Sequence, residues 1–99
     1  MKLNTWNLRG SCSPLKQKEI YKLLRTQILF VLSLIETRLK SSKVDEAHKI
    51  IAPYFNFHTN HSSHYNGRIF LLCNATVISL TVLSEARYYI HCVVNDLLT

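Results

Sequence analysis

The apolar run at residues 28–35 (Ile-Leu-Phe-Val-Leu-Ser-Leu-Ile) constrains the fold of this chain more than any other stretch. It is broken only by Ser33 and is followed by an acid, Glu36. A short apolar run without alternation is typical of a strand buried on both faces, in the middle of a parallel or mixed sheet. It is too short to span a bilayer, which needs about 20 apolar residues. We therefore predict a central strand with the Glu36 carboxylate at its exit, where open α/β sheets commonly bind ligands.

The segments before this run predict a strand–helix–strand unit. Residues 3–8 are predicted to form a first strand, and residues 14–26 to form an amphipathic helix with an apolar face and a basic face. Ser13 is a candidate N-cap, and Pro14 suits the first helical position. Because such a unit pairs its two strands in parallel with a right-handed crossover, the strands at 3–8 and 28–35 should be parallel neighbours.

The second half of the chain predicts one more helix and then strands. Ser42 followed by Asp45 is a weak capping box, an apolar stripe runs from Val44 to Ile51, and Pro53 ends the helix. A strand is predicted at 54–58, followed by a polar loop that ends in the turn pair Asn66-Gly67. The last three β-rich segments are expected to form an antiparallel meander: 68–73, 77–83 and 88–94. The predicted order is β-α-β-α-β-β-β-β, a mixed α/β fold that forms one small domain or part of a larger one.

Composition narrows the classes of function. Twelve Lys and Arg residues oppose six Asp and Glu residues, a formal charge of +6 that suits a polyanionic partner such as nucleic acid. The alternative is a basic surface with no partner. The three cysteines are odd in number and lack Cys-x-x-Cys spacing, so neither a disulfide framework nor a zinc knuckle follows.

The same features suggest where the protein is found. Free thiols fit a reducing compartment, and the first residues form no secretory apolar region. We therefore expect an intracellular protein, cytoplasmic or nuclear, that is not secreted and does not enter a membrane. On that basis, the two matches to the glycosylation sequon, at Asn60 and Asn74, are treated as chance.

Asn7 and Glu36 are the candidate site residues. Each lies at the exit of a predicted strand, and two parallel neighbours bring both side chains to the same edge of the sheet. One acid and one amide are groups that Mg²⁺ and a phosphate can use together, since Mg²⁺ often takes only one or two carboxylates plus substrate phosphate. The alternative is that Glu36 is a solvated strand end and Asn7 a turn residue.

Several motifs resemble the endonuclease/exonuclease/phosphatase superfamily, in particular the endonuclease domain of plant non-LTR retroelement proteins, which precedes a reverse transcriptase. The motifs that carry the resemblance are Trp6-Asn7-Leu8-Arg9-Gly10, Ser13-Pro14-Leu15-Lys16-Gln17-Lys18, Leu34-Ile35-Glu36-Thr37-Arg38, Asn66-Gly67-Arg68-Ile69 and Ile90-His91-Cys92. They occur in the same order and cover nearly the whole chain. The resemblance implies a DNase I-like fold, a four-layered α/β sandwich of two mixed sheets flanked by helices.

The resemblance also implies an activity. Members of this superfamily cleave phosphodiester or phosphomonoester bonds with Mg²⁺ or Mn²⁺. The metal-binding Glu falls on Glu36, and the active-site Asn falls on Asn7. Arg9 and Arg38 lie near the same edge and are expected to meet a DNA backbone, although the motif does not make them catalytic.

The sequence departs from the family in its second half. An Asp/Asn pair and an Asp-His pair are expected there, and the sequence ends at Thr99 before either; His91 and Asp96 are not set in matching motifs. His91 is interpreted as a packed mid-strand histidine. We therefore expect the N-terminal half of the sandwich, a truncated endonuclease domain that binds Mg²⁺ weakly at most and is inactive alone. Half a sandwich should leave the strand at 69–73 uncovered and favour self-association.

Other interpretations stay open at this point. The chain could be a non-enzymatic, basic nucleic-acid-binding module, or a product without a selected role. His58, His61 and His64 could form a metal clip, although a solvated loop explains them as well. Tyr88 and Tyr89 beside Arg87 could stack on bases, or simply belong to a strand and its edge.

Overall fold

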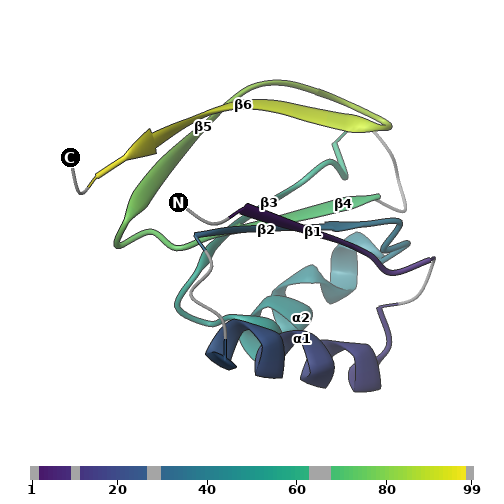
Figure 1. Cartoon of the computed structure of the whole chain (residues 1–99). Coiled ribbons are helices and arrows are strands. Elements are labelled where there is room, and N and C mark those ends of the chain that lie inside the picture. Colours follow the sequence, from purple (N-terminus) through teal and green to yellow (C-terminus); the bar gives the residue numbers. More distant parts are fainter. Residues whose placement is uncertain (1–2, 10–11, 27–29, 63–67, 98–99) are drawn as a thin grey trace.

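The computed structural model describes residues 3–9, 12–26, 30–62 and 68–97 (Figure 1). Its elements are β1 (Leu3–Asn7), α1 (Pro14–Thr26), β2 (Val31–Ile35), the 3₁₀ turn η1 (Ser41–Lys43), α2 (Val44–Ile51), β3 (Asn56–Thr59), β4 (Ile69–Cys73), β5 (Ile78–Ala86) and β6 (Tyr89–Asp96). Within these residues the fold is mixed α/β, with two α-helices and six strands in the predicted order.

The first four strands form one sheet with the order β1-β2-β4-β3. β1 and β2 are parallel, with Asn7 opposite Ile35, as the strand–helix–strand unit predicts. The other two pairs, β2 with β4 and β4 with β3, are antiparallel. β2 and β4 therefore occupy the centre of the sheet, which is the place that their unbroken apolar sequences require.

The predicted meander of the last three strands is wrong. β4 pairs with β2 and β3, whereas β5 and β6 form a separate two-stranded sheet. Both edges of β4 are already occupied, so the next strand cannot pair with it, and the chain leaves the sheet after Cys73. It does so in a turn at Asn74, whose carbonyl accepts hydrogen bonds from the backbone N–H of Val77 at 3.2 Å and of Ile78 at 3.1 Å.

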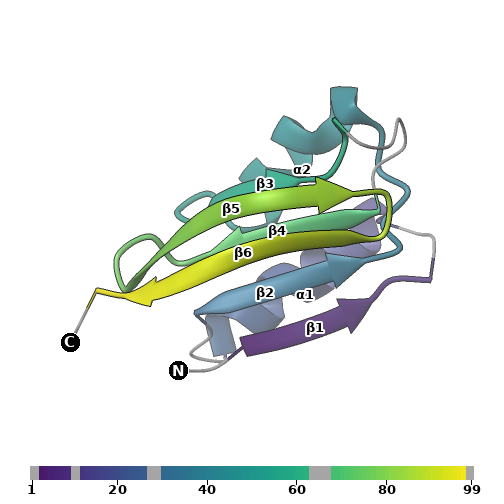
Figure 2. The same ribbon diagram turned by 90° about the horizontal axis from the view of Figure 1, so that it is seen from above.

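The described residues form three layers. The helices cover one face of the four-stranded sheet, and the β5–β6 hairpin lies across the other face (Figures 1 and 2). The helix side buries Ile20 and Ile51 against Leu32, Leu34, Phe70 and Leu72. The hairpin side buries Ile78 against Val31, Leu71 and Cys73, with Leu80, Ile90, Cys92 and Val94 at its margin.

The expectation that residues 69–73 would have an uncovered face is also wrong. Successive β4 side chains enter the two cores in turn, and from Phe70 to Cys73 all are buried. One group of exposed apolar side chains lies instead on the outer face of the hairpin, where Leu83 is 55%, Tyr89 52% and Val93 42% exposed. A strand face of this kind is a site for further packing.

The ends of some elements differ from the predicted ones. Ser13 does cap α1, since its Oγ accepts the N–H of Lys16 at 3.3 Å. The predicted capping box at Ser42 is wrong, because Ser42 lies within η1, which precedes α2. The N-cap of α2 is Lys43, which makes no side-chain cap bond. The third strand starts at Asn56, because a turn bonds the N–H of Phe55 to the carbonyl of Ala52 at 3.0 Å. The start of the predicted run at 28–29 and the turn pair at 66–67 lie outside the described residues.

Candidate functional site

Several strands meet at one end of the molecule, which we call the exit end. β1, β2, β3 and β5 finish there, and β4 and β6 begin there. In Figure 2 the arrowheads of β1, β2 and β5 point toward it, on the right of the view. The loops of both sheets are therefore brought together at this end.

The structure places Asn7 and Glu36 together at the exit end. Asn7 is the last residue of β1 and pairs with Ile35, the last residue of β2, so Glu36 follows directly beside it. The N–H of Leu8 extends the pairing by donating to the carbonyl of Ile35 at 3.0 Å. Asn7 and Glu36 are both exposed. An amide and a carboxylate are thus held on adjacent strand ends.

The backbone at these strand ends is unusual. Among the described residues, the non-glycine residues with positive φ are Arg9 at 54°, Glu36 at 56° and Arg38 at 47°. The left-handed conformation costs about 1–2 kcal/mol for a residue with a Cβ. Such residues cluster at binding and catalytic sites, because the surrounding structure must hold them in place. All three are also predicted from the sequence to lie at the candidate site.

The segment after β2 is anchored by Thr37, which is only 3% exposed. The Thr37 N–H donates to the carbonyl of Arg68 at 3.3 Å, and its Oγ1 accepts the N–H of Leu39 at 3.4 Å. Because Thr37 is turned into the protein, its neighbours Glu36 and Arg38 are both exposed. Sequence reasoning missed this anchor, although the pattern Glu-Thr-Arg places the less polar side chain between two charged ones.

His61 holds the same segment from the other side. Its Nε2 donates to the carbonyl of Leu39 at 2.5 Å, and its Nδ1 accepts the hydroxyl of Thr59 at 2.7 Å. His58 bonds instead to Glu85, with 2.8 Å between Nε2 and Oε1. His64 lies outside the described residues. The interpretation of His58 and His61 as residues of a solvated loop is therefore wrong, and the two rings do not share a ligand.

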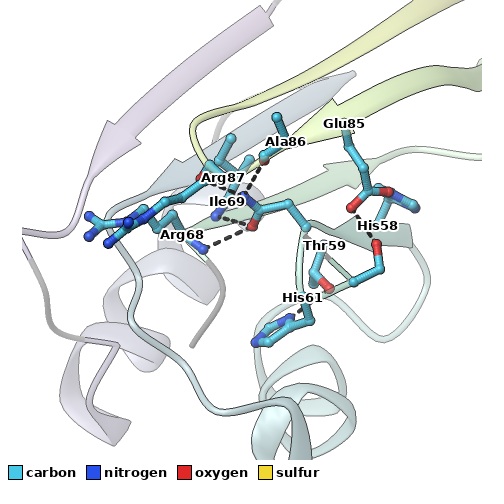
Figure 3. A network of polar contacts seen from close by, with 10 residues as sticks. His58, Thr59, His61, Arg68, Ile69, Glu85, Ala86 and Arg87 are labelled. Atoms are coloured by element: carbon cyan, nitrogen blue, oxygen red, sulfur yellow. Dashed lines mark hydrogen bonds and ion pairs between the residues drawn. The ribbon is translucent and has the colours of Figure 1, made fainter. Parts of the chain in front are cut away.

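Asn60 joins the two sheets at the exit end, where Figure 3 shows Arg68 and Ile69 beside Ala86 and Arg87. Its side chain is completely buried. Oδ1 accepts the N–H groups of Arg68 at 2.9 Å and Ile69 at 3.0 Å, while Nδ2 donates to the carbonyls of Ala86 at 3.0 Å and Arg87 at 2.8 Å. The amide therefore uses all four of its hydrogen-bonding positions. Its burial also agrees with treating the sequon at this residue as chance.

Glu85 forms a second bridge between the sheets. It lies on β5, accepts hydrogen bonds from His58 on β3 and from the hydroxyl of Ser62 at 2.8 Å, and has a side chain only 17% exposed. Burial acts to raise the pKa of Glu85, but the hydrogen bonds from Ser62 and His58 and the charge of the imidazole outweigh it. The pKa of Glu85 therefore lies below its ordinary value, and this carboxylate belongs to the scaffold.

The donor set at Asn7 and Glu36 fits a weakly held Mg²⁺ or Mn²⁺. Asn7 Oδ1 accepts the N–H of Arg9 at 2.8 Å, which fixes the amide and leaves its NH₂ group to donate to a phosphate oxygen. Glu36 offers the carboxylate. No group of three or more His, Cys, Asp or Glu side chains gathers among the described residues. Mg²⁺ can accept such a sparse protein site when water and substrate phosphate supply the other oxygens.

His91 and Asp96 do not extend this site. His91 lies on β6 opposite Ser84 and is exposed, so its interpretation as a packed histidine is wrong. Asp96 pairs with Ile78 at the opposite end of the hairpin from the β5–β6 turn. Neither residue is placed where it could assist Glu36.

An apolar hollow of about 520 Å³ opens between β3 and the hairpin. Its lining includes Phe57, Leu71, Ile78, Leu80 and Val82. Asn7 and Glu36 are not part of the lining. The hollow is therefore separate from the candidate site.

No protein family, curated protein or solved structure matches the chain in sequence or structure comparisons. In the part of the chain that the structure describes, no helix combines the length and the apolar content needed to cross a membrane.

Proposed function

We propose that this chain forms the part of a Mg²⁺-dependent endonuclease domain that contributes Asn7 and Glu36 to the metal and phosphate site. The observation that carries the proposal is the placement of these two residues on adjacent parallel strand ends, in loops with left-handed backbone at Arg9, Glu36 and Arg38. In this role Glu36 holds the metal and the Asn7 NH₂ group donates to a phosphate oxygen. The metal, Mg²⁺ or Mn²⁺, supplies charge stabilisation at the phosphate.

The architecture supports the same proposal. A helix layer, a mixed sheet and a second sheet packed face to face are three of the layers of a DNase I-like sandwich. We propose that the β5–β6 hairpin belongs to the second sheet of such a sandwich, in the manner of the endonuclease domains of plant non-LTR retroelements. In a four-layered sandwich, helices cover the outer face of that sheet, and here this face exposes Leu83, Tyr89 and Val93.

We expect DNA to be the partner and the chain alone to bind it without hydrolysing it. Hydrolysis needs a group that orients or deprotonates water in addition to the metal. The described residues near Glu36 offer a single carboxylate and an amide. Both ring nitrogens of the neighbouring His61 are already hydrogen-bonded, one to Thr59 and the other to Leu39. Arg9 and Arg38, both exposed beside the site, are expected to contact the DNA backbone.

The test measures DNA binding and plasmid nicking by the same preparations. Binding of a fluorescein-labelled duplex should strengthen when EDTA is replaced by Mg²⁺, and Glu36→Gln should remove that increase. Glu19→Gln removes an exposed acid on α1 and should leave it unchanged. An equal response of the two variants would refute the metal site. Nicking of supercoiled plasmid that disappears in Glu36→Gln would show that the chain is itself active.

A non-enzymatic nucleic-acid-binding module is the second candidate. It is favoured by the net charge of +6 together with a candidate site that holds only one carboxylate. In that case DNA binding should fall steeply with salt, because phosphate contacts release counterions, yet be indifferent to Mg²⁺ and to Glu36→Gln. The binding experiment above therefore separates the two candidates.

A further inference from the structure

Most of the described arginines gather at the exit end, whereas most of the described lysines lie on the helices. Four of the five arginines lie at the exit end, and these are Arg9, Arg38, Arg68 and Arg87. The lysines within the described residues lie on the helices and the segment before α2, and these are Lys16, Lys18, Lys22, Lys40, Lys43 and Lys49. Arginine is the side chain that recognises phosphate through its planar fork of N–H donors. Its concentration at one end indicates a surface for phosphates.

Two of these arginines share one aromatic ring. The guanidinium carbons of Arg68 and Arg87 each lie 5.2 Å from the centre of the Tyr88 ring. Tyr88 itself is 68% exposed. Cation–π contacts of this kind restrain a guanidinium while leaving its N–H donors free. Tyr88 therefore orients two positive charges at the surface.

The backbone beneath this cluster is fixed by Asn60. The Asn60 amide accepts the N–H of Arg68 and donates to the carbonyl of Arg87, so one buried side chain holds both arginines in place (Figure 3). Arg68 directly precedes β4, and Arg87 and Tyr88 form the β5–β6 turn. The cluster thus bridges the two sheets on a rigid support, as a binding site requires.

Within the described residues, no acid side chain neutralises these two positive charges. Glu85, the acid nearest in sequence, is already bonded to His58 and Ser62. Among the described residues neither arginine forms an ion pair, and the Nε of Arg68 is shielded from solvent without an acceptor. Two like charges on one ring repel each other, so the arrangement favours an anionic ligand.

We propose that Arg68, Tyr88 and Arg87 form a phosphate clamp that holds the nucleic-acid backbone beside the Glu36 site. The clamp is next to that site, because the N–H of Thr37, the residue after Glu36, donates to the carbonyl of Arg68. The ring of Tyr88 already contacts both guanidinium groups, so its role is to support them rather than to stack on a base. This inference rests on the proposed nucleic-acid partner.

The inference is tested by fluorescence anisotropy with a fluorescein-labelled DNA duplex in EDTA, over a series of salt concentrations. Arg87→Gln and Tyr88→Ala change exposed residues and should each weaken binding about fivefold or more, with Arg87→Gln lowering the salt slope by about one. Tyr88→Phe keeps the ring and should bind like the wild type. Arg68→Lys keeps a charge but loses the planar fork, and should also weaken binding. Lys18→Gln, on α1, is the control for net charge and should have little effect.

The outcomes distinguish this inference from the proposed function, because the assay is free of metal. If Arg87→Gln and Lys18→Gln weaken binding equally, a diffuse basic surface is responsible and the clamp is refuted. If the clamp variants lose affinity in EDTA while Glu36→Gln has no effect in Mg²⁺, the clamp stands and the metal site fails. If Tyr88→Phe loses as much as Tyr88→Ala, the ring does not act as a support. If the wild type does not bind DNA, both proposals fail.

Discussion

Replacing Asn60 with alanine should remove the main polar connection between the two sheets. The change leaves four partly buried backbone groups without their partner, two N–H groups at Arg68 and Ile69 and two carbonyls at Ala86 and Arg87. Each lost hydrogen bond costs about 1 kcal/mol net, and more where the group stays buried and unpaired. The expected loss is about 3–5 kcal/mol, a large part of the 5–15 kcal/mol that stabilises a typical domain.

The assay is urea unfolding followed by far-ultraviolet circular dichroism. Asn95→Ala, an exposed asparagine on β6, is the matched control and should change the free energy of unfolding by less than about 0.5 kcal/mol. Asn60→Asp gives a second reading, since it keeps the shape but places a carboxylate oxygen against the carbonyls of Ala86 and Arg87. It should be at least as destabilising at neutral pH, with partial recovery in acid, where a protonated carboxyl can donate one bond.

The result that would refute this reasoning is a loss below about 1 kcal/mol for Asn60→Ala, or one equal to that of Asn95→Ala. Either result would mean that the apolar contacts around Ile78 and the Glu85 bridge hold the sheets together without a measurable contribution from Asn60. A variant that does not fold would agree with the reasoning only if Asn95→Ala folds normally. Asn60→Ser, which can keep one donor and one acceptor, should then recover part of the stability.

Three further predictions concern Glu85, Arg38 and the outer face of the hairpin. The pKa of Glu85 is lowered in the folded protein, so its ionised carboxylate stabilises the fold above the ordinary pKa of 4.5. This stabilisation is lost as the pH falls through the lowered pKa. The difference in the free energy of unfolding between wild type and Glu85→Gln, measured by urea unfolding, should therefore close in that pH range. A gap that persists in strong acid would contradict this. Arg38→Gly removes the cost of a left-handed backbone for a residue with a Cβ, so it should raise the free energy of unfolding by about 1 kcal/mol while weakening DNA binding. A loss of stability would contradict the claim that the backbone at Arg38 is strained. The exposed apolar side chains on the outer face of the hairpin should promote self-association. Light scattering should show a mass that rises with protein concentration and returns to that of a monomer in Leu83→Lys or Val93→Lys. A wild type that stays monomeric would contradict this prediction.

The strand–helix–strand unit could be predicted because its local and long-range signals agree. The Ser13 cap and Pro14 place the start of α1, and the observed helix has the predicted bounds. Right-handed crossover then requires parallel pairing of β1 and β2. The position of Asn7 beside the end of β2 follows from that pairing without any side-chain information.

The split of the last strands into two sheets was harder to predict. Residues 69–73 carry no alternation, which is typical of a central strand with both edges paired, whereas β6 alternates between half-buried and exposed positions. These two patterns are incompatible with one shared meander, but residues 77–94 give no local signal for the face on which they pack. Only the tertiary structure decides that, because the other face of the sheet is already covered by the helices.

The supports of the candidate site could not be predicted for a related reason. Asn60 meets Arg87 across 27 residues of sequence, and His61 meets Leu39 across 22. In the sequence, both residues look like members of a polar loop, since nothing local distinguishes a buried hydrogen-bonded side chain from a solvated one. The pairing of Arg68 with Tyr88 likewise depends on how the two sheets meet.

Binding of Mn²⁺, followed by residue-resolved NMR, tests the central claim most directly, because a paramagnetic ion broadens the signals of nuclei near its site. If Asn7 and Glu36 form the metal and phosphate site, Mn²⁺ should broaden the backbone amide signals of Leu8, Arg9 and Thr37 first, and Glu36→Gln should abolish this while Glu19→Gln preserves it. Broadening centred elsewhere, or unchanged in Glu36→Gln, would contradict the account.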